Sequence, residues 1–361
     1  MFRSIRVKNW KGLKSLEMQN LGKINLLVGA NNVGKTSFLE ILAFLAGKRP
    51  LDSLVSPMRS RIPDLITSMV STSDLFSNYF SEMELSNTIE LELESSPKTK
   101  VRLSFSLKPS DKTVSHKMLR ELGNDAEAAT ATRDSVVLQV LLDDFQGEPI
   151  SIGEIYESAN GEIQIAQREG FVDSAPGVMF APAGGLLASK WVMEMWGQLE
   201  TQKSEQPLVD ALKLIEPRIK SIKTALFAGQ YRICADIGLR SLLPIQFLGG
   251  GVNHLFSLLL PISNPLISMV LLDEIENGFY RRHFNDLWVT LNRIAEIKGE
   301  CQIFATTHSW ECVETAIEFF ADAPSDRFRV HRLERRKYQT ACITYDNIEA
   351  MRALNQGHEV R

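Results

Sequence analysis

The sequence lacks several features that mark whole classes of protein. Its 361 residues contain no apolar run of the roughly 18 residues that a membrane-spanning helix needs. The first residues, Met1 to Arg6, alternate like a strand where a signal peptide would carry an apolar run. The four cysteines are scattered and form no C-x-x-C pair, which argues against a disulfide framework and a zinc site. We therefore expect a cytoplasmic protein that makes no use of a membrane.

Three further absences reduce the range of possible functions. There is no Asn-Lys-x-Asp motif to read guanine, which disfavours a GTPase. No heptad pattern is sustained, so we expect no long coiled-coil arm, and no arrangement of residues suggests a nuclease centre. A formal net charge of −4 gives no global attraction to nucleic acid, so any such binding would need a local basic patch.

A glycine-rich stretch near the N-terminus carries the clearest signal. Residues 29–36 read Gly-Ala-Asn-Asn-Val-Gly-Lys-Thr and fit the phosphate-loop pattern G-x-x-x-x-G-K-[ST]. An apolar run, Ile24–Val28, predicts a buried strand before it, and an apolar-periodic segment, Thr36–Leu45, predicts a helix after it. Glycines at both ends let backbone N–H groups wrap a phosphate at the start of the helix. The stretch predicts a nucleotide site.

Each side chain of this loop has an expected role. Lys35 would reach the β- and γ-phosphates, and the hydroxyl of Thr36 would bind Mg²⁺. The residues that we predict to contact the nucleotide are Gly29, Asn31, Asn32, Gly34, Lys35, Thr36 and Ser37. Trp10, in the turn between two N-terminal strand candidates (2–7 and 16–19), would either stack on adenine or pack in the core, and we favour the core.

Two later strands supply the rest of a hydrolytic site. The apolar run Ile267–Leu272 ends in Asp273 and Glu274, as expected of a buried parallel strand with acids at its carboxyl end. Asp273 would hold Mg²⁺, and Glu274 would take a proton from the attacking water. A second apolar run, 302–307, delivers His308 to the same edge of a doubly wound sheet, where it would sense the γ-phosphate.

A triple glycine forms a fourth motif. Gly249, Gly250 and Gly251 precede the apolar-periodic segment Val252–Leu260, so they would open a helix and offer a second anion cradle. The pattern alone is equally consistent with a flexible turn, and it gains weight from the other three motifs.

The remaining segments give coarser expectations. Strict alternation over 88–107 predicts a hairpin with one wet face that carries Glu90, Glu92 and Glu94; with candidates at 136–142 and 161–167 it makes a β-rich insert. Residues 49–73 and 111–133 read as connections, and 177–182 would return the chain to the main sheet. Helices are expected over 186–199 and 207–222, with Trp191, Met195 and Trp196 in the core. A closing helix is expected over 347–355.

The segment Arg327–Lys337 is rich in basic residues and alternates like a hairpin. It would either contact nucleic acid or a protein partner, or form a solvated hairpin balanced by acids elsewhere. The pattern favours neither interpretation.

The ordered set of motifs resembles the ABC-type ATPases, in particular the stand-alone AAA-domain ATPases related to SMC, RecN and the OLD nucleases. The resemblance rests on Val7–Gly12, the phosphate loop, Asp273–Gly278 and Phe304–Ser309, and it covers 1–48 and 236–320 best. It implies that Gly249–Gly251 is the signature loop, which closes on ATP held by a second subunit, and that 276–280 is the D-loop at that interface. It also implies ATP and Mg²⁺ as ligands and a homodimer or higher homo-oligomer as the assembly.

The chain departs from this family pattern in the signature loop. The usual Leu-Ser-Gly-Gly-Gln is replaced by Leu-Gly-Gly-Gly-Val at 248–252, so contact in trans would rest on backbone N–H groups and the helix dipole. A basic residue is usual after the glycines in related small ATPases, whereas Asn253 and His254 follow here. The glutamine of the Q-loop has no clear position.

These observations together predict an α/β fold: a P-loop NTPase of the ABC type with a mixed and parallel sheet, a β-rich insert and a helical subdomain. The expected domain limits are 1–48 and 236–361 for the two parts of the ATPase domain, 49–180 for the insert and 181–235 for the helical subdomain. Similar ATPases are subunits of bacterial anti-phage systems such as PARIS and Septu, which implies an effector partner such as a TOPRIM or HNH nuclease. The alternatives are a nucleotide-dependent scaffold with negligible turnover and a DNA-repair ATPase that acts on DNA directly.

Overall fold

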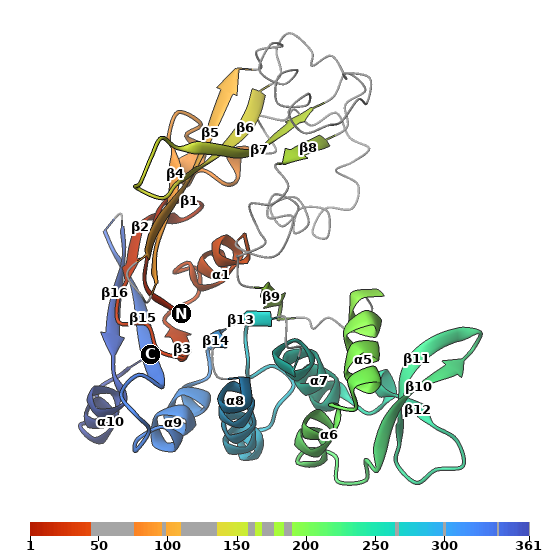
Figure 1. The fold of residues 1–361 in the computed structure, drawn as a ribbon. Coiled ribbons are helices and arrows are strands. Elements are labelled where there is room, and N and C mark those ends of the chain that lie inside the picture. The colour runs from red at the N-terminus through yellow and green to blue at the C-terminus, as the bar shows by residue number, and fades with distance from the viewer. Residues whose placement is uncertain are drawn as a thin grey trace.

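The computed structural model describes residues 1–44, 76–95, 99–109, 136–157, 163–167, 177–183, 190–263, 267–298, 301–337 and 339–360 (Figure 1). The connections predicted at 49–73 and 111–133 lie outside the described residues. The described residues form three sheets: a seven-stranded and a six-stranded sheet with one helix between them, and a small three-stranded sheet. A layer of helices lies beneath the six-stranded sheet. None of the described helices is both long enough and apolar enough to cross a membrane.

The six-stranded sheet holds the strands that the motifs predicted. Its order is β16-β15-β3-β14-β13-β9, and all neighbours are parallel except β15 and β16. The strands are β3 (Ile24–Val28), β9 (Gly177–Ala181), β13 (Ile267–Leu272), β14 (Gln302–Thr306), β15 (Phe328–Arg336) and β16 (Gln339–Tyr345). Every residue of β3 is buried because sheet neighbours cover both its edges and packed layers cover both its faces. The carboxyl ends of β3, β13 and β14 therefore meet at one edge.

The seven-stranded sheet is antiparallel throughout, in the order β2-β1-β4-β5-β6-β7-β8. Its strands are β1 (Phe2–Trp10), β2 (Leu13–Met18), β4 (Ile89–Ser95), β5 (Thr99–Pro109), β6 (Val136–Asp143), β7 (Ile150–Glu157) and β8 (Ile163–Gln167). The predicted insert strands thus extend the N-terminal hairpin through the β1–β4 pairing. Strand β7 was not predicted, because the three-residue step from Ile152 to Ile155 breaks the two-residue alternation.

Helix α1 (Lys35–Ala43) lies between the two sheets, and its apolar side chains enter a core shared with both. Trp10 closes this core at the start of α1. It is 1% exposed, its ring stacks on Tyr79 with centroids 5.0 Å apart, and its Nε1 donates a hydrogen bond to the carbonyl of Ser37 at 2.7 Å. The core interpretation of Trp10 is confirmed, and the indole braces the helix that follows the phosphate loop.

The opposite face of the six-stranded sheet is covered by helices. These are α5 (Lys190–Gln202), α6 (Gln206–Lys213), α7 (Gly250–Ser263), α8 (Phe284–Lys298), α9 (Trp310–Phe319) and α10 (Asn347–Asn355). Met195 and Trp196 are buried as expected, whereas the side chain of Trp191 lies outside the described residues. The closing helix α10 is confirmed, and a capping box of Asp346 and Glu349 fixes its start.

The expectation of helices as far as Ile222 is wrong. Helix α6 ends at Lys213, and a hairpin of β10 (Ser221–Phe227) and β11 (Gln230–Asp236) follows, with the short strand β12 (Leu243–Pro244) beside it. The two-residue turn is Ala228-Gly229, both at positive φ (48° and 78°), which is the conformation that tight hairpins require. An alanine at a position that usually carries Asn, Asp or Gly hides this turn in the sequence.

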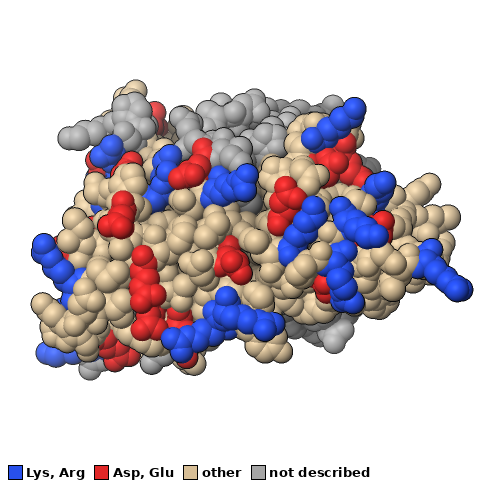
Figure 2. Space-filling view, turned by 90° about the horizontal axis from the view of Figure 1, so that it is seen from below, with Lys and Arg blue, Asp and Glu red and all other residues tan. Residues whose placement is uncertain are grey.

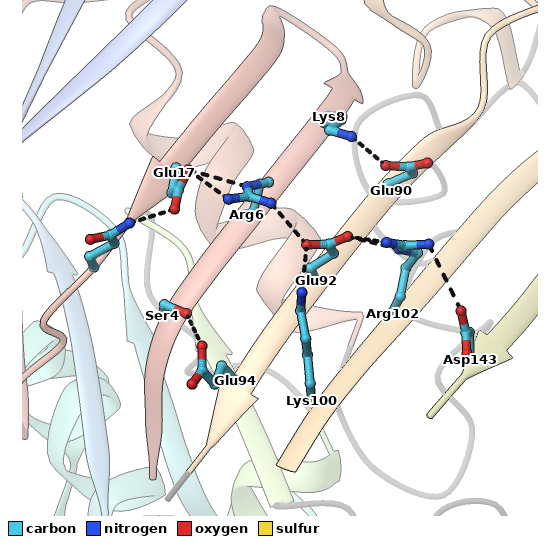
Figure 3. A network of polar contacts seen from close by, with 11 residues as sticks. Ser4, Arg6, Lys8, Glu17, Glu90, Glu92, Glu94, Lys100, Arg102 and Asp143 are labelled. Carbon is cyan, nitrogen blue, oxygen red and sulfur yellow. Dashed lines mark hydrogen bonds and ion pairs between the residues drawn. The ribbon is translucent and has the colours of Figure 1, made fainter. Parts of the chain in front are cut away.

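The expectation of a solvated acidic face on β4 is wrong at Glu92. Glu92 is only 6% exposed, and three cations surround its carboxylate: Arg102 at 2.5 Å, Arg6 at 3.2 Å and Lys100 at 3.7 Å (Figure 3). Burial opposes ionisation, but the hydrogen bond and ion pair with Arg102, helped by Lys100 and Arg6, outweigh it and lower the pKa of Glu92. Cross-strand neighbours, which local alternation does not reveal, decide this burial.

The basic segment is an interior part of the main sheet, since β15 pairs with β3. His331 lies at its centre, fully buried, with Nε2 donating to Asn25 Oδ1 (3.1 Å) and Nδ1 accepting from Thr344 Oγ1 (3.0 Å). Burial, with a smaller effect of Arg329, lowers the pKa of His331 to about 3. The imidazole is therefore neutral in the folded state.

This neutral histidine predicts a specific acid sensitivity. Because the folded pKa (about 3) lies below the ordinary 6.5, the unfolded chain takes up the proton first, and stability falls as pH drops from 6.5 toward 3. The expected loss from this group between pH 7 and pH 4.5 is about 3 kcal/mol. Urea unfolding at the two pH values should show a smaller pH dependence for His331→Asn than for the wild type. The exposed His358, changed to Asn, serves as the control; an unaltered pH dependence in His331→Asn would contradict the assignment.

Candidate active site

The phosphate loop connects β3 to α1 and needs both of its glycines. Gly29 and Gly34 have φ values of 136° and 107°, which side chains rarely adopt. A Cβ on Gly29 would lie 2.4 Å from the carbonyl oxygen of Leu333, and one on Gly34 would lie 2.4 Å from Cδ2 of Leu13. The loop is thus held between β15 and the N-terminal hairpin, with its N–H groups free to face an anion at the start of α1.

Lys35 closes the mouth of this loop. Its Nζ donates to the carbonyls of Gly29 (2.6 Å) and Ala30 (3.0 Å) and lies 3.3 Å from Nδ1 of His308. The side chain is 5% exposed, and burial lowers its pKa against the opposing pull of nearby carboxylates, the nearest in effect being Asp273. A poorly solvated ammonium of this kind forms a strong electrostatic interaction with an anion that binds next to it.

Asp273 and Thr36 face each other across the gap between β13 and α1. The hydroxyl of Thr36 donates to both carboxylate oxygens of Asp273 at 3.1 Å, and Thr306 Oγ1 donates to Oδ1 at 2.7 Å. Burial raises the pKa of Asp273, while the two hydroxyl donors oppose the rise. A hydroxyl and a carboxylate are hard oxygen donors, so this pair fits Mg²⁺.

Glu274 follows directly and has a strained backbone. Its φ is 49°, an uncommon value for a residue with a side chain, and its N–H donates to Thr306 Oγ1 at 2.8 Å. The carboxylate is held on both sides: Nδ2 of Asn277 donates to Oε2 at 2.7 Å, and Nε2 of His308 lies 3.4 Å from Oε1. This backbone conformation directs the side chain of Glu274 away from the axis of β13 and toward the imidazole of His308.

His308 links the two halves of the site. Its Nδ1 faces Lys35 and its Nε2 faces Glu274, so it stands between the phosphate loop and the predicted base. The structure thus brings together Lys35, Thr36, Asp273, Glu274 and His308, as the first three motifs predicted. The resemblance placed Glu276 and Asn277 in a loop at the subunit interface, but it did not predict their contacts with His308 and Glu274 of the same chain.

The triple glycine does not join this cluster. Gly250 begins α7, whose buried residues belong to the core on the helical face of the sheet, whereas α1 belongs to the core on the other face. Gly251 packs instead against Gly278, whose carbonyl oxygen would lie 2.7 Å from a Cβ on Gly251. The phosphate loop and the triple glycine of one chain therefore open helices on opposite faces of one sheet.

A depression of about 830 Å³ opens beside the phosphate loop. It is lined by residues 29–33, by His308 and by the end of β15, including Arg335. The other basic side chains of β15 are largely paired: Arg332 and Arg336 both bind Glu334. Arg327, just before the strand, pairs with Glu296.

Residues 1–168 match the family of the AAA ATPase domain. This part of the chain is therefore similar to AAA ATPase domains. The match includes the phosphate loop, whereas β13 and β14, whose carboxyl ends lie beside that loop, belong to the second half of the chain and are outside the matched residues.

Two curated proteins are similar to this chain. An ATP/GTP phosphatase of Helicobacter pylori (strain ATCC 700392 / 26695) is 20% identical over 335 residues, which cover 87% of each chain. An uncharacterized protein of Methanocaldococcus jannaschii is 40% identical over 60 residues, 16% of this chain, and the match spans only 27% of that protein's length.

Solved SMC heads are also similar in structure. An SMC head bound to the C-terminal winged-helix domain of ScpA has a TM-score of 0.47 at 14% identity, with 97% of this chain and 99% of that chain covered. The SMC head domain from Thermotoga maritima has a TM-score of 0.42 at 11% identity, with 95% and 98% covered.

Proposed function

We propose that this chain binds Mg-ATP at the edge formed by β3, β13 and β14, hydrolyses it to ADP and phosphate, and does so between two copies of itself. The observation that carries the proposal is the convergence of Lys35, Thr36, Asp273, Glu274 and His308, which come from three strand ends. Phosphoryl transfer to water needs three components, and all three are present here. They are a lysine in a glycine loop, a hydroxyl that faces a carboxylate, and a second carboxylate next to an imidazole.

The geometry assigns a task to each side chain. The loop N–H groups and Lys35 bind the β- and γ-phosphates, and Thr36 with Asp273 holds Mg²⁺, which neutralises phosphate charge when bound. The oxygen of the attacking water forms a bond to the γ-phosphorus while the bond between this phosphorus and the β–γ bridging oxygen breaks. Glu274 accepts the proton that the water loses. His308 contacts the γ-phosphate and the base together, so it reports whether the phosphate is present.

The position of the triple glycine supports a sandwich of two copies. In one chain α7 packs on the face of the six-stranded sheet opposite to the face that carries α1, so we expect Gly249–Gly251 to reach the γ-phosphate held by another copy. The amino end of α7 offers N–H groups and a positive dipole, which suit an anion without the usual serine. The signature loop of one copy would thus complete the site of the other.

We further propose that the opening and closing of this sandwich regulates an effector protein in anti-phage defence, such as a TOPRIM or HNH nuclease. Support comes from the resemblance of Asp273–Gly278 and Phe304–Ser309 to the ATPase subunits of such systems. Direct action on DNA is less well supported, because the cations of β15 are largely paired within the chain. On the face that carries α8, α9 and α10, basic and acidic side chains are interspersed (Figure 2).

The mass of Glu274→Gln in solution tests the sandwich. This variant should bind ATP without hydrolysing it, so light scattering on a sizing column should show a doubled mass with Mg-ATP and a single-chain mass without it. Gly250→Trp in the same background should abolish the increase. Gly250 has no atom within 4 Å of its Cβ position, so a side chain placed there begins in open space in the single chain, and we expect the bulk of tryptophan to act against a partner.

Gly147→Trp is the matched control, because Gly147 also has open space and lies between β6 and β7, away from the site. A constant single-chain mass would refute the sandwich for this chain alone. A constant higher mass would support the alternative of a preassembled scaffold, in which ATP changes shape and not stoichiometry.

A further inference from the structure

The segment that follows β13 folds back on itself immediately after the predicted base. The N–H of Asn277 donates to the carbonyl of Glu274 at 3.0 Å, and the N–H of Phe279 donates to that of Glu276 at 3.1 Å. These two consecutive turns place Asn277, Glu276 and Gly278 against three different parts of the site, namely the predicted base, the start of α9 and the start of α7.

Asn277 contacts the base. Its Nδ2 donates to Glu274 Oε2 at 2.7 Å, and the same amide lies 3.5 Å from the carbonyl of Ala183, just beyond the end of β9. The other oxygen of Glu274 faces His308, so the amide and the imidazole hold the carboxylate between them. Removing the amide leaves Glu274 free to rotate about its side-chain bonds.

Glu276 contacts the switch histidine through the backbone. Its Oε1 accepts hydrogen bonds from the N–H groups of His308 (2.5 Å) and Ser309 (3.1 Å), at the amino end of α9. A carboxylate at a helix amino end is favourable, and two donors on one oxygen fix the backbone from which the imidazole projects. Its Oε2 is buried and has no hydrogen-bond partner among the described residues, so only one oxygen of this carboxylate is used.

Gly278 contacts the start of α7. Its carbonyl would lie 2.7 Å from a Cβ on Gly251, and its φ is 81°. One turn further along α7, His254 packs edge-on against Phe279 with ring centroids 5.5 Å apart. The turn that holds the base and the histidine is therefore packed against the helix that carries the triple glycine.

We propose that Asn277 and Glu276 are positioning residues of the hydrolytic centre: Asn277 orients the carboxylate of Glu274, and Glu276 fixes the backbone from which His308 projects. The inference rests on the proposed ATPase function.

The first test is Asn277→Ala, measured by steady-state ATP hydrolysis. Asn277 contacts the base and not the phosphate loop, so kcat should fall about 10- to 100-fold while KM for ATP stays within about threefold. Asn277→Asp keeps the shape but loses the N–H donor and places a second carboxylate beside Glu274, so it should be at least as slow. Asn292→Ala is the matched control, because it removes an amide-to-glutamate hydrogen bond of the same kind (Asn292 to Glu296, 3.2 Å) on the exposed face of α8.

A double-mutant cycle separates positioning from general damage. If Asn277 acts through Glu274, then adding Asn277→Ala to Glu274→Gln should reduce the residual single-turnover rate by less than about twofold. A merely structural role would lower the rate equally in both backgrounds.

At Glu276, a conservative substitution should preserve the rate of hydrolysis that a truncating substitution lowers. Glu276→Gln keeps the one oxygen that accepts both N–H groups, so it should retain kcat within about threefold, whereas Glu276→Ala should lose about 10-fold or more. Wild-type kcat in Asn277→Ala, an equal loss in both backgrounds, or an equal effect of Gln and Ala at Glu276 would overturn the inference alone. A wild type that hydrolyses no ATP would instead overturn the proposed function and the inference with it, whereas an active Glu274→Gln would overturn the role of Glu274 as the base and the inference that depends on it.

Discussion

Replacing Glu274 by glutamine is expected to lower kcat for ATP hydrolysis by at least about 100-fold and to leave ATP affinity within about threefold. Glutamine preserves the shape and keeps an oxygen that can accept the N–H of Asn277, but it cannot take a proton from water. The phosphate contacts come from the loop and Lys35, which this substitution does not touch. Phosphate release and equilibrium binding of a fluorescent ATP analogue measure the two quantities separately.

Glu318→Gln provides the control for this experiment, since Glu318 is an exposed glutamate on α9 away from the site. Its kcat should match that of the wild type. Turnover by Glu274→Gln at the wild-type rate would assign the proton transfer to another group, and His308 would be the next candidate to change.

Replacing Lys35 by alanine should weaken ATP binding about 30- to 100-fold and should abolish measurable turnover at ordinary ATP concentrations. A charge-assisted contact to phosphate contributes about 2–3 kcal/mol, and Lys35 is the cation held inside the loop mouth. The substitution also leaves the carbonyls of Gly29 and Ala30 without their donor, so part of the loss reflects a disordered loop. Isothermal titration with the non-hydrolysable analogue AMP-PNP measures the effect.

Lys213→Ala removes an exposed lysine that pairs with Asp210 on α6, and it should bind the analogue like the wild type. Equal affinities for Lys35→Ala and Lys213→Ala would show that the loop does not grip phosphate. Thermal melting of both variants without nucleotide separates loss of binding from loss of folding.

The positions of the strong motifs could be predicted because each motif is short. The strand, glycines and lysine of residues 24–36 are contiguous, and Asp273 and His308 sit at the carboxyl ends of apolar runs whose meeting point follows from parallel pairing. The structure confirms that these side chains lie together. Their chemical roles remain predictions that the variants above address.

The features that were missed depend on contacts between distant residues. Glu92 reads as a surface residue until Arg6 and Lys100 are placed around it, and the basic hairpin reads as peripheral until β15 is paired with β3. Asn277 and Glu276 are two polar residues in a turn, and only the folded chain shows that they point at Glu274 and His308. Side chains near an active site are positioned by tertiary contacts that local periodicity does not encode.

The place of β3 in its sheet has a consequence for how the protein is made. Both of its neighbours, β14 and β15, come from residues 302–336, so the strand that carries the phosphate loop leaves the ribosome about 300 residues before its partners. At roughly 5–20 residues per second this delay is about 15–60 s. During that time β3 lacks both of the strands that flank it in the folded sheet. The nascent chain gains its grip on ATP only when nearly all of the sequence described here has been synthesised.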